Sequence, residues 1–465
     1  MKTTDSDPGI PAPGGRPVQA PALRRFRGIF RAGRPARPSV TASPAIAAAQ
    51  AFLDHLLSPS PSLDVGFRLW DGTPWPDAAP RAATIVLHHP GALRQMFRHG
   101  TEIGVAEAYL ADDFDVEGDM ETACGLADRL EHRATGWRAA LATYRRFRRL
   151  PGGTGAWTGR RTFLASGQPH SLARDRAAIS FHYDLSNDFY RLWLDREMLY
   201  SCAYFETPEA TLEAAQQAKL RHLCRKLRLR PGQRLLDIGC GWGALALHAA
   251  REHGVEVTGI TLSARQAELA RARVHAAGLD GRVDIELRDY RELREPEGYD
   301  AIVSVGMSEH VGAGGLPGYF RMVAGLLRPG GVFLNHAIGE GARPRRHRGP
   351  SFIDRHVFPD SDIPPVTIVT AAAEGAGFEV RDVENLREHY ALTLRHWVRR
   401  LEAGHTAALA HVAEPVYRVW RLYMAGSARG FHHGHLAIYQ LLLAKLDSAG
   451  RAPLPLTRAD WYQQT

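Results

Sequence analysis

The sequence predicts an α/β fold in which a domain with a mainly parallel sheet is preceded by a smaller α+β domain. From about residue 178 onward, apolar runs of strand length alternate with helical segments, a pattern typical of parallel strands joined by helices. A glycine-rich turn directly after the first of these runs supports the same fold, because ligands gather at the carboxyl ends of such strands. Between about residues 46 and 150, two strand-like runs are instead followed by several helical segments.

Composition divides the chain of 465 residues into four parts. Residues 1–45 carry eight basic and two acidic side chains and are rich in Pro, Gly and Ala, so we expect a disordered basic tail. We expect residues 46–150 to form the small N-terminal α+β domain, which is a candidate for lipid binding. Residues 151–177 form a linker that begins with Pro and Gly, and residues 178–465 are expected to form the larger domain with C-terminal helices.

Within the basic tail, Leu23, Phe26 and Phe30 fall on one helical face among arginines. This pattern fits a short helix that lies on an anionic membrane surface. It fits a merely solvated basic tail equally well, so both interpretations stay open.

The elements of the two domains follow from the periodicity of their apolar residues. In the small domain we expect half-buried strands over 67–70 and 84–88, and helices over 90–99, 105–110 and 120–133. A basic run at 145–149 closes this domain, and it fits either a solvated helix face or a contact with lipid headgroups. In the larger domain, strands are expected at 234–238, 255–260, 283–287, 300–305, 331–335 and 378–383.

The glycine turn at 239–243 is the most informative motif of the chain. Glycines at 239, 241 and 243 follow an apolar strand that ends in Asp237 and Ile238. Glycine lets the backbone turn sharply and approach a ligand without an intervening Cβ. No phosphate-binding Lys follows, which excludes a P-loop, and the next strand ends at Ile260 without the acid that grips the ribose in dinucleotide folds. The turn therefore fits the S-adenosylmethionine pocket of a Rossmann-like class I methyltransferase domain.

Polar residues directly follow five of the predicted strands. They are Asp237, Thr261 to Ser263 with Gln266, Asp289 with Tyr290, Glu309 with His310, and His336. Because the carboxyl ends of parallel strands meet at one edge of a sheet, we expect these residues to surround one site.

The chain closely resembles the cyclopropane-fatty-acyl-phospholipid synthase family and its mycolic acid cyclopropane synthase relatives. The resemblance is firm from about residue 180 to 445 and looser before that. It rests on motifs at 182–190, 200–205, 215–220, 235–243, 261–263, 303–311, 335–339, 387–394 and 430–431.

This resemblance implies a reaction and a set of catalytic residues. A methylene is transferred from S-adenosylmethionine to the cis double bond of an unsaturated acyl chain in a membrane phospholipid, which yields a cyclopropane fatty acid. The weakly nucleophilic alkene attacks the sulfonium methyl, and the resulting carbocation loses a proton to a bound bicarbonate. The matching catalytic positions are Cys202, Glu309, His336, Ile338 and Tyr390.

The resemblance also implies where the cofactor binds. Asp237, Gly239 and Gly241 would line the methionine half of S-adenosylmethionine. The remaining positions are Tyr200 and Ser201 over the cofactor, Thr261, Ser263 and Gln266 near the ribose, and Asp289 and Tyr290 near the adenine.

Other features of the sequence limit partners and location. There is no apolar run of about 18 residues that could span a membrane, and no signal peptide is apparent. The four cysteines lack paired spacing, so neither a zinc site nor a disulfide framework is expected. We therefore expect a cytoplasmic protein that associates peripherally with the inner, anionic face of the cell membrane, with no metal and no nucleic acid; a homodimer stays open.

Two departures from the family pattern bear on the substrate. Ser308 stands where many relatives have Phe, and this smaller side chain would reshape the acyl channel. The loop at 341–348 is also unusually basic. Three other functions compete with cyclopropanation: a lipid C-methyltransferase that leaves a methyl branch or a methylene group, a nicotinamide-dependent oxidoreductase, and a nucleic-acid methyltransferase. The missing acid after Ile260 disfavours the second, and only the net charge suggests the third.

Overall fold

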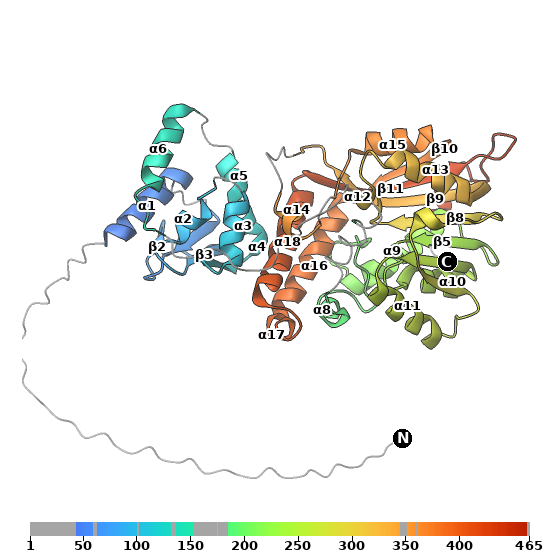
Figure 1. Cartoon of the computed structure of the whole chain (residues 1–465), viewed down its shortest axis with the longest axis horizontal. Coiled ribbons are helices and arrows are strands. Elements are labelled where there is room, and N and C mark those ends of the chain that lie inside the picture. Colours follow the sequence, from blue (N-terminus) through green and yellow to red (C-terminus); the bar gives the residue numbers. More distant parts are fainter. Residues whose placement is uncertain are drawn as a thin grey trace, which may run out of the picture. The chain divides into compact units, whose positions relative to one another are not determined.

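A computed structural model of the whole chain describes residues 43–58, 63–99, 102–131, 136–152, 174, 185–344, 351–358 and 361–462. The predictions for the tail at 1–42, for the start of the 182–190 motif and for residues 345–350 of the basic loop lie outside the described residues. The elements below all belong to the unit that begins at Ser43 and are labelled in Figure 1.

Residues 43–465 form one compact unit, and we keep the terms small and larger domain for the regions predicted as 46–150 and 178–465. The small domain contains a four-stranded sheet with the order β2-β1-β3-β4. Its strands are β1 (Val65–Arg68), β2 (Pro74–Trp75), β3 (Ala83–Leu87) and β4 (Phe114–Gly118). The first two predicted strands correspond to β1 and β3, whereas β2 and β4 were not predicted. The strand β2 has only two residues, which is too short to show an alternating pattern. The strand β4 buries only Phe114 and Val116, and its other side chains are acidic.

Six helices accompany this sheet. They are α1 (Pro44–Leu57), α2 (Ala92–Met96), α3 (Glu102–Leu110), α4 (Met120–Cys124), α5 (Leu126–Glu131) and α6 (Trp137–Phe147). The predicted helix over 120–133 is divided at Gly125, which caps the end of α4. Its start is set by Asp119, whose side chain accepts a hydrogen bond from the backbone N–H of Glu121.

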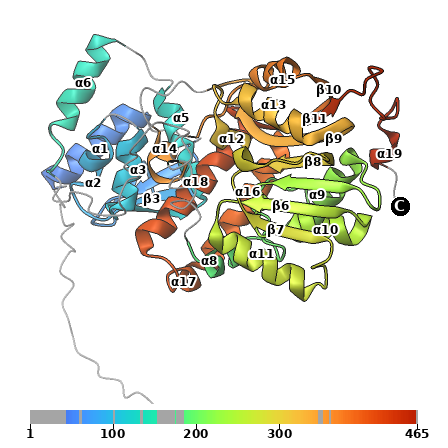
Figure 2. The same ribbon diagram turned by 45° about the vertical axis from the view of Figure 1, so that its right-hand side comes forward.

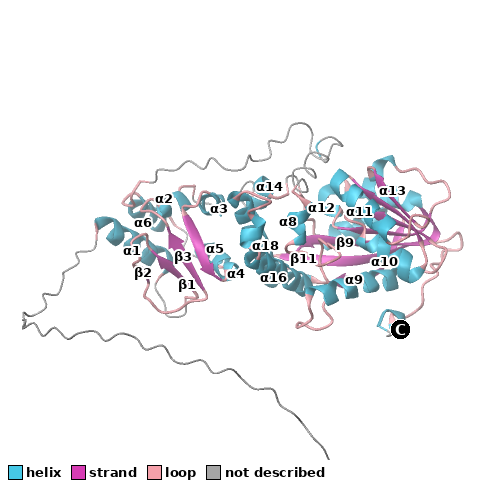
Figure 3. Cartoon of the chain, turned by 90° about the horizontal axis from the view of Figure 1, so that it is seen from below, coloured by secondary structure: helices cyan, strands magenta, loops and turns pink. Residues whose placement is uncertain are grey.

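The larger domain is built on a seven-stranded sheet with the order β10-β11-β9-β8-β5-β6-β7, seen from below in Figure 3. All neighbours from β9 to β7 pair in parallel, so the predicted α/β fold with a mainly parallel sheet is confirmed. The strands are β5 (Arg234–Ile238), β6 (Glu256–Thr261), β7 (Val283–Leu287), β8 (Tyr299–Val305), β9 (Leu327–Glu340), β10 (Phe378–Asn385) and β11 (Leu436–Lys445).

The strand β11 is the main difference from the sequence-based expectation, which placed helices at the C-terminus. It pairs antiparallel with both β9 and β10 and fills the space between them. Its residues Ile438 to Ala444 are almost all buried, because neighbours cover the strand on both faces. A short buried run that is mostly apolar, here interrupted only by Gln440, fits a buried helix as well as a buried strand, so the pattern alone does not distinguish them.

Helices cover both faces of the large sheet (Figure 2). Leu235 packs with α9 (Leu212–Leu227), α10 (Ala244–His253) and α11 (Ala264–Ala276). The next residue, Leu236, points to the other face and packs with α13 (Leu316–Leu326) and α15 (Val366–Gly375), as the two-residue period of a strand requires. The remaining helical elements are α8 (Asn187–Arg191), η1 (Tyr290–Glu292), α12 (Ser308–Val311), α14 (Phe352–His356), α16 (Arg387–Ala403), α17 (His405–Ala408), α18 (Glu414–His432) and α19 (Ala459–Tyr462).

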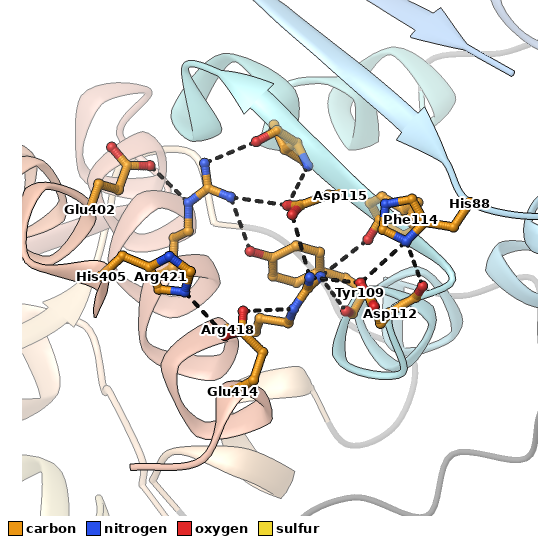
Figure 4. Close-up of polar contacts among 11 residues, drawn as sticks. His88, Tyr109, Asp112, Phe114, Asp115, Glu402, His405, Glu414, Arg418 and Arg421 are labelled. Atoms are coloured by element: carbon orange, nitrogen blue, oxygen red, sulfur yellow. Dashed lines mark hydrogen bonds and ion pairs between the residues drawn. The ribbon is translucent and has the colours of Figure 1, made fainter. Parts of the chain in front are cut away.

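Two buried arginines of α18 bind the segment at 109–116 of the small domain (Figure 4). Arg418 donates hydrogen bonds to the carbonyl of Tyr109, at 3.0 Å, and to the carboxylate of Asp112, at 2.7 Å. Arg421 donates to the carbonyl of Val116, at 3.1 Å, and to the carboxylate of Glu402 on α16, at 2.8 Å. Guanidinium groups supply several donors in a fixed plane, so each can satisfy several buried acceptors at once.

Among the described residues, no helix is both long enough and apolar enough to cross a membrane.

Candidate active site

A pocket opens at the carboxyl ends of the parallel strands. Its wall includes Asp237 and the glycine turn after β5, Thr261 and Gln266 after β6, and Tyr290 after β7. Tyr200 and Ser201, which precede α9 in the chain, also line it. Of the ten positions predicted to bind the cofactor, eight line this pocket: Tyr200, Ser201, Asp237, Gly239, Gly241, Thr261, Gln266 and Tyr290.

The glycine turn leaves room above the backbone. Gly239 and Gly241 have φ angles of +82° and +55°, a region that side chains with a Cβ rarely adopt. A Cβ on Gly239 would lie 2.8 Å from Cγ of Met307, whereas one on Gly241 would meet nothing within 4 Å. The backbone at Gly241 therefore borders open space, which a ligand in the pocket can fill.

Asp237 is a buried carboxyl group with one unpartnered oxygen. Its Oδ2 atom has no hydrogen-bond partner among the described residues, and burial raises its pKa to about 7 while the nearby Lys219 opposes that shift. A buried acceptor without a donor is costly. The amino group of a bound amino-acid moiety would supply one, so this residue fits the predicted methionine half of S-adenosylmethionine.

The segment that carries Tyr200 and Ser201 is held by two polar side chains of α9 that were not assigned a role from the sequence. Gln216 donates hydrogen bonds to the carbonyls of Leu199, at 3.2 Å, and Ser201, at 3.0 Å. Lys219 Nζ donates to Ser201 Oγ, at 2.8 Å. Burial lowers the pKa of Lys219 to about 8, and this lysine also lines the pocket. Gln216 and Lys219 are two of the four polar side chains that α9 buries, with His222 and Lys226, and no local pattern separates them from the other two.

Ser263 and Asp289 have positions different from the other predicted cofactor residues, because neither lines the pocket. Ser263 starts α11, and its hydroxyl accepts a hydrogen bond from the backbone N–H of Gln266. Asp289 is fully buried and binds the guanidinium of Arg291 at 2.8 Å; its carboxylate also caps η1. Both residues therefore shape the loops from which Thr261, Gln266 and Tyr290 reach the pocket.

Glu309 and Ile338 form a direct contact beside the pocket. Glu309 lies on α12, is buried, and accepts a hydrogen bond through Oε1 from the backbone N–H of Ile338 on β9, at 2.8 Å. Its Oε2 atom has no partner among the described residues. Burial raises the pKa of Glu309 to about 7. The carboxyl group can therefore either hold or release a proton near neutral pH.

His336 lies two residues before Ile338, on the same face of β9. Its ring is fully buried, and burial lowers its pKa to about 3, so the ring is neutral. Nδ1 lies 3.3 Å from the side-chain nitrogen of Gln440 on β11, and Nε2 has no partner among the described residues. If the Gln440 amide donates to Nδ1, Nε2 carries the proton and is a buried donor without an acceptor.

Cys202 and Tyr390 belong to the apolar cluster that adjoins Ile338. The Cys202 thiol donates to the carbonyl of Ala203, at 3.3 Å, and burial raises its pKa far above the usual range, so it is a neutral packing group. Tyr390 lies on α16, with its ring 4.7 Å from that of Phe431. Leu386 connects Tyr390 to the strands of the sheet. Its carbonyl accepts a hydrogen bond from the backbone N–H of Tyr390, and its own N–H donates to the carbonyl of Ile438, the residue of β11 that pairs with Ile338.

The five predicted catalytic residues do not line the cofactor pocket themselves. Met307 and His310, which flank Glu309 in sequence, do. The structure therefore places Glu309 immediately behind the pocket wall. Ser308, the departure from the family pattern, is buried and donates to Asn335 Oδ1 at 2.8 Å.

A separate cluster of Cys224, His248 and His253 lies between α9 and α10, with its sulfur and ring nitrogens within 4.8 Å of one another. The sequence gave no spacing that predicted this cluster. Burial raises the thiol pKa of Cys224 and lowers the pKa of His248 to about 4. Arg221 and Arg251 lower it further. The Glu252 carboxylate opposes this shift, and we assign no function to the cluster.

Comparisons with known proteins agree with this geometry. The family described as mycolic acid cyclopropane synthetase matches residues 170–441. A probable fatty acid methyltransferase of Pseudomonas putida is 41% identical over 404 residues, which cover 86% of this chain and 97% of that protein. The cyclopropane-fatty-acyl-phospholipid synthase of Escherichia coli strain K12 is 39% identical over 264 residues, or 57% of this chain and 66% of that one. The crystal structure of mycolic acid cyclopropane synthase CmaA1 complexed with SAH and CTAB covers 58% of this chain and 98% of its own, with 36% identity and a TM-score of 0.55.

Proposed function

The chain belongs to the mycolic acid cyclopropane synthetase family, and we propose that it cyclopropanates unsaturated acyl chains of membrane phospholipids. As a member of this family it is an S-adenosylmethionine-dependent methyltransferase. In the proposed reaction, one alkene carbon bonds to the sulfonium methyl as the sulfur–carbon bond breaks. The methyl then loses one proton, and its carbon bonds to the second alkene carbon.

The residues around the pocket fit the cofactor. S-adenosylmethionine, when bound, supplies a methyl group made electrophilic by its sulfonium. Asp237 would accept from the amino group of the methionine half, and Thr261 and Gln266 lie where the ribose would bind. Tyr200 and Trp242 also line the pocket. Aromatic faces attract a cation by roughly 0.5–2 kcal/mol, so they would help to hold the sulfonium.

The observation that carries the proposal is that two buried polar atoms, Glu309 Oε2 and His336 Nε2, have no hydrogen-bond partner among the described residues. Simple methyl transfer to a heteroatom needs no such buried group beside an apolar cluster. Ring closure needs a proton acceptor that is protected from water, because a carbocation would otherwise react with it. Glu309, with its pKa near 7, is suited to move a proton at this position.

The same two atoms could hold a small anion. Bicarbonate, when bound, supplies a proton acceptor. His336 Nε2 would donate to it, Tyr390 would contribute its hydroxyl, and Glu309 would accept from its hydroxyl group. Cys202 and Ile338 would bound the site, Ile338 through the backbone N–H that orients Glu309.

A second product is supported by three relatives, two described as probable fatty acid methyltransferases and one as a tuberculostearic acid methyltransferase. The relative from Pseudomonas putida is described as a probable fatty acid methyltransferase and aligns along nearly its whole length. If a hydride first shifts from the methyl-bearing carbon to the cationic carbon, loss of a proton from the methyl leaves a methylene group. Loss of a proton from a neighbouring chain carbon instead leaves a methyl branch beside an internal double bond. This alternative uses the same cofactor pocket and differs only in the step by which the carbocation loses its positive charge.

The proposal also implies a location. The substrate is part of a bilayer, so we propose that the protein associates peripherally with the inner face of the cell membrane.

The direct test is to incubate the purified protein with S-adenosylmethionine and vesicles of unsaturated phospholipid, and to analyse the acyl chains. We expect each product chain to gain one CH₂ unit, to lose its olefinic proton signals and to gain the high-field signals of a cyclopropane. Olefinic methylene signals would instead support the alternative product, and unchanged lipid would contradict both.

A further inference from the structure

Helix α6 carries an unusual concentration of exposed apolar side chains. Trp137, Leu141 and Tyr144 have exposed fractions of 72%, 39% and 56%. They account for three of the nine large apolar side chains that are exposed among the described residues. Their spacing of four and three residues puts them on one face of the helix.

The opposite face of α6 is held by the domain. Thr143 Oγ1 lies 2.8 Å from His55 Nε2 on α1, and the ring of Phe147 packs at 6.4 Å from that of Phe52. Arg94 stacks on Phe147 at 5.6 Å and donates to the carbonyl of Leu150 at 3.0 Å. The helix lies along α1 in both Figure 1 and Figure 2. Its apolar face is therefore presented outward by a packed element.

The charge around this face has one sign. Residues 136–152 contain five arginines, at 138, 145, 146, 148 and 149, and no acidic residue. At 100° per residue, Arg138 and Arg145 lie beside the apolar face, and Arg148 and Arg149 directly follow the end of the helix at Phe147. The guanidinium of Arg138 lies 5.2 Å from the ring of Trp137. Within the described part of the chain, none of the five has a carboxylate at ion-pair distance.

We propose that this α6 surface, made of Trp137, Leu141, Tyr144 and the five arginines, docks the protein on an anionic phospholipid bilayer. Trp and Tyr are favoured at the headgroup level, where one edge of the ring is apolar and the other is wet. A group of arginines without acids complements anionic headgroups. An eleven-residue helix is too short to span a bilayer but suits one that lies in the interface. The inference rests on the proposed function, because it names the surface that brings the enzyme to its substrate.

The test compares full-length variants in flotation with vesicles of phosphatidylglycerol and phosphatidylcholine. One variant combines Trp137→Ser, Leu141→Ser and Tyr144→Ser, and another combines Arg145→Glu and Arg149→Glu. The matched control combines Ile368→Ser and Leu409→Ser, which remove apolar side chains that are exposed by 44% and 40% elsewhere. All variants should keep the circular dichroism and melting temperature of the parent, because none of the changed side chains is buried.

We expect both α6 variants to bind anionic vesicles at least about tenfold more weakly than the parent, while the control binds normally. High salt should weaken binding by the parent. Unchanged binding of either α6 variant would overturn the proposal, and so would equal, salt-independent binding of the parent to pure phosphatidylcholine. A parent dimer that becomes monomeric in the apolar variant, with vesicle binding intact, would instead identify α6 as a subunit interface.

A detergent-dispersed unsaturated phospholipid separates this proposal from the proposed function. The α6 variants should turn over this substrate like the parent, because it does not require docking on a bilayer. If neither the parent nor any variant modifies a lipid, but vesicle binding changes as expected, the proposed function is contradicted and the docking surface is supported.

Discussion

Asp237 and Glu309 are two buried carboxyl groups whose pKa values burial raises to about 7. A carboxyl group with a raised pKa in the folded state contributes stability below its unfolded pKa, near 4, and loses it as pH rises through 7. Both groups therefore disfavour folding of the cofactor-free protein at alkaline pH. A donor supplied by a ligand would relieve that cost, which is a reason to find such groups at a binding site.

Asp237→Asn removes one of these titrations. Without cofactor, the free energy of unfolding of the parent minus that of the variant should fall by roughly 2–4 kcal/mol from pH 4 to pH 8, because only the parent has to ionise Asp237. Denaturant unfolding at several pH values measures this difference. Asp284→Asn, at an exposed aspartate on β7, is the control and should show no such divergence. Parallel pH profiles for parent and Asp237→Asn would contradict the assignment of a raised pKa to Asp237.

At this scale, the sequence indicated many pocket residues but not their partners. Asp237 and the glycines were recognisable because strand ends and turns have local signatures. Lys219 was not assigned a role, because its contact with Ser201 depends on how α9 packs against the preceding segment. The resemblance to the family placed Ser263 and Asp289 in the cofactor site. In the structure they cap α11 and η1, and their contact with the cofactor stays a prediction.

Helix α9 supports the cofactor pocket through Lys219. Lys219→Met would remove the hydrogen bond to Ser201, and we expect affinity for S-adenosylmethionine to fall about tenfold, as for the loss of a charged hydrogen bond. Calorimetry measures that affinity. In a double-mutant cycle, Ser201→Ala should lower it similarly and add little to Lys219→Met. Fully additive losses would mean that the two side chains act independently.

The glycine turn between β5 and α10 is the second element that can be tested. Gly241→Val puts a side chain into the open space of the pocket, and we expect it to abolish measurable cofactor binding in a folded protein. Gly278→Val is the matched control, since Gly278 has a φ of +65° and open space around it but does not line the pocket. It should suffer the same backbone strain and still bind the cofactor. Normal affinity in Gly241→Val would show that the ligand lies elsewhere.

Element prediction succeeded where the local pattern was unambiguous. Each predicted strand of the larger domain overlaps one of β5 to β10, because alternating strands and helices give a repeated signal. The strand β11 differs, because it is buried between two neighbours and its apolar run has no period of its own. The strand β2 spans two residues, which is too short for any periodicity.

On the scale of the whole molecule, one apolar cluster extends from the small sheet through α18 and α16 to the segment at 189–205. The arginines of α18 add polar contacts across the same region (Figure 4). These contacts join residues about three hundred positions apart, and no local pattern could have indicated them.

Arg418→Ala removes the charged donor to the carbonyls of Tyr109 and Phe114 and the partner of the Asp112 carboxylate. We expect the free energy of unfolding to fall by about 3–5 kcal/mol, as when one partner of a buried ionic network is removed. Thermal or denaturant unfolding measures the change. Arg451→Ala is the control, because Arg451 is an exposed arginine paired with Asp447, and it should cost less than about 1 kcal/mol. Equal effects of the two substitutions would contradict a stabilising role for the α18 contacts.

The measurement that tests the proposed chemistry most directly is the activity of Glu309→Gln. Glutamine keeps the size and one acceptor of Glu309 but cannot take or give up the proton, and the bond from Ile338 can still form. We expect unchanged affinity for S-adenosylmethionine and a turnover on unsaturated phospholipid that is lower by roughly 10²–10⁴-fold, the usual scale of acid–base catalysis. Glu340→Gln, at the end of β9, should react like the parent. Turnover of Glu309→Gln at the rate of the parent, with the same product, would contradict the assignment of proton removal to this site.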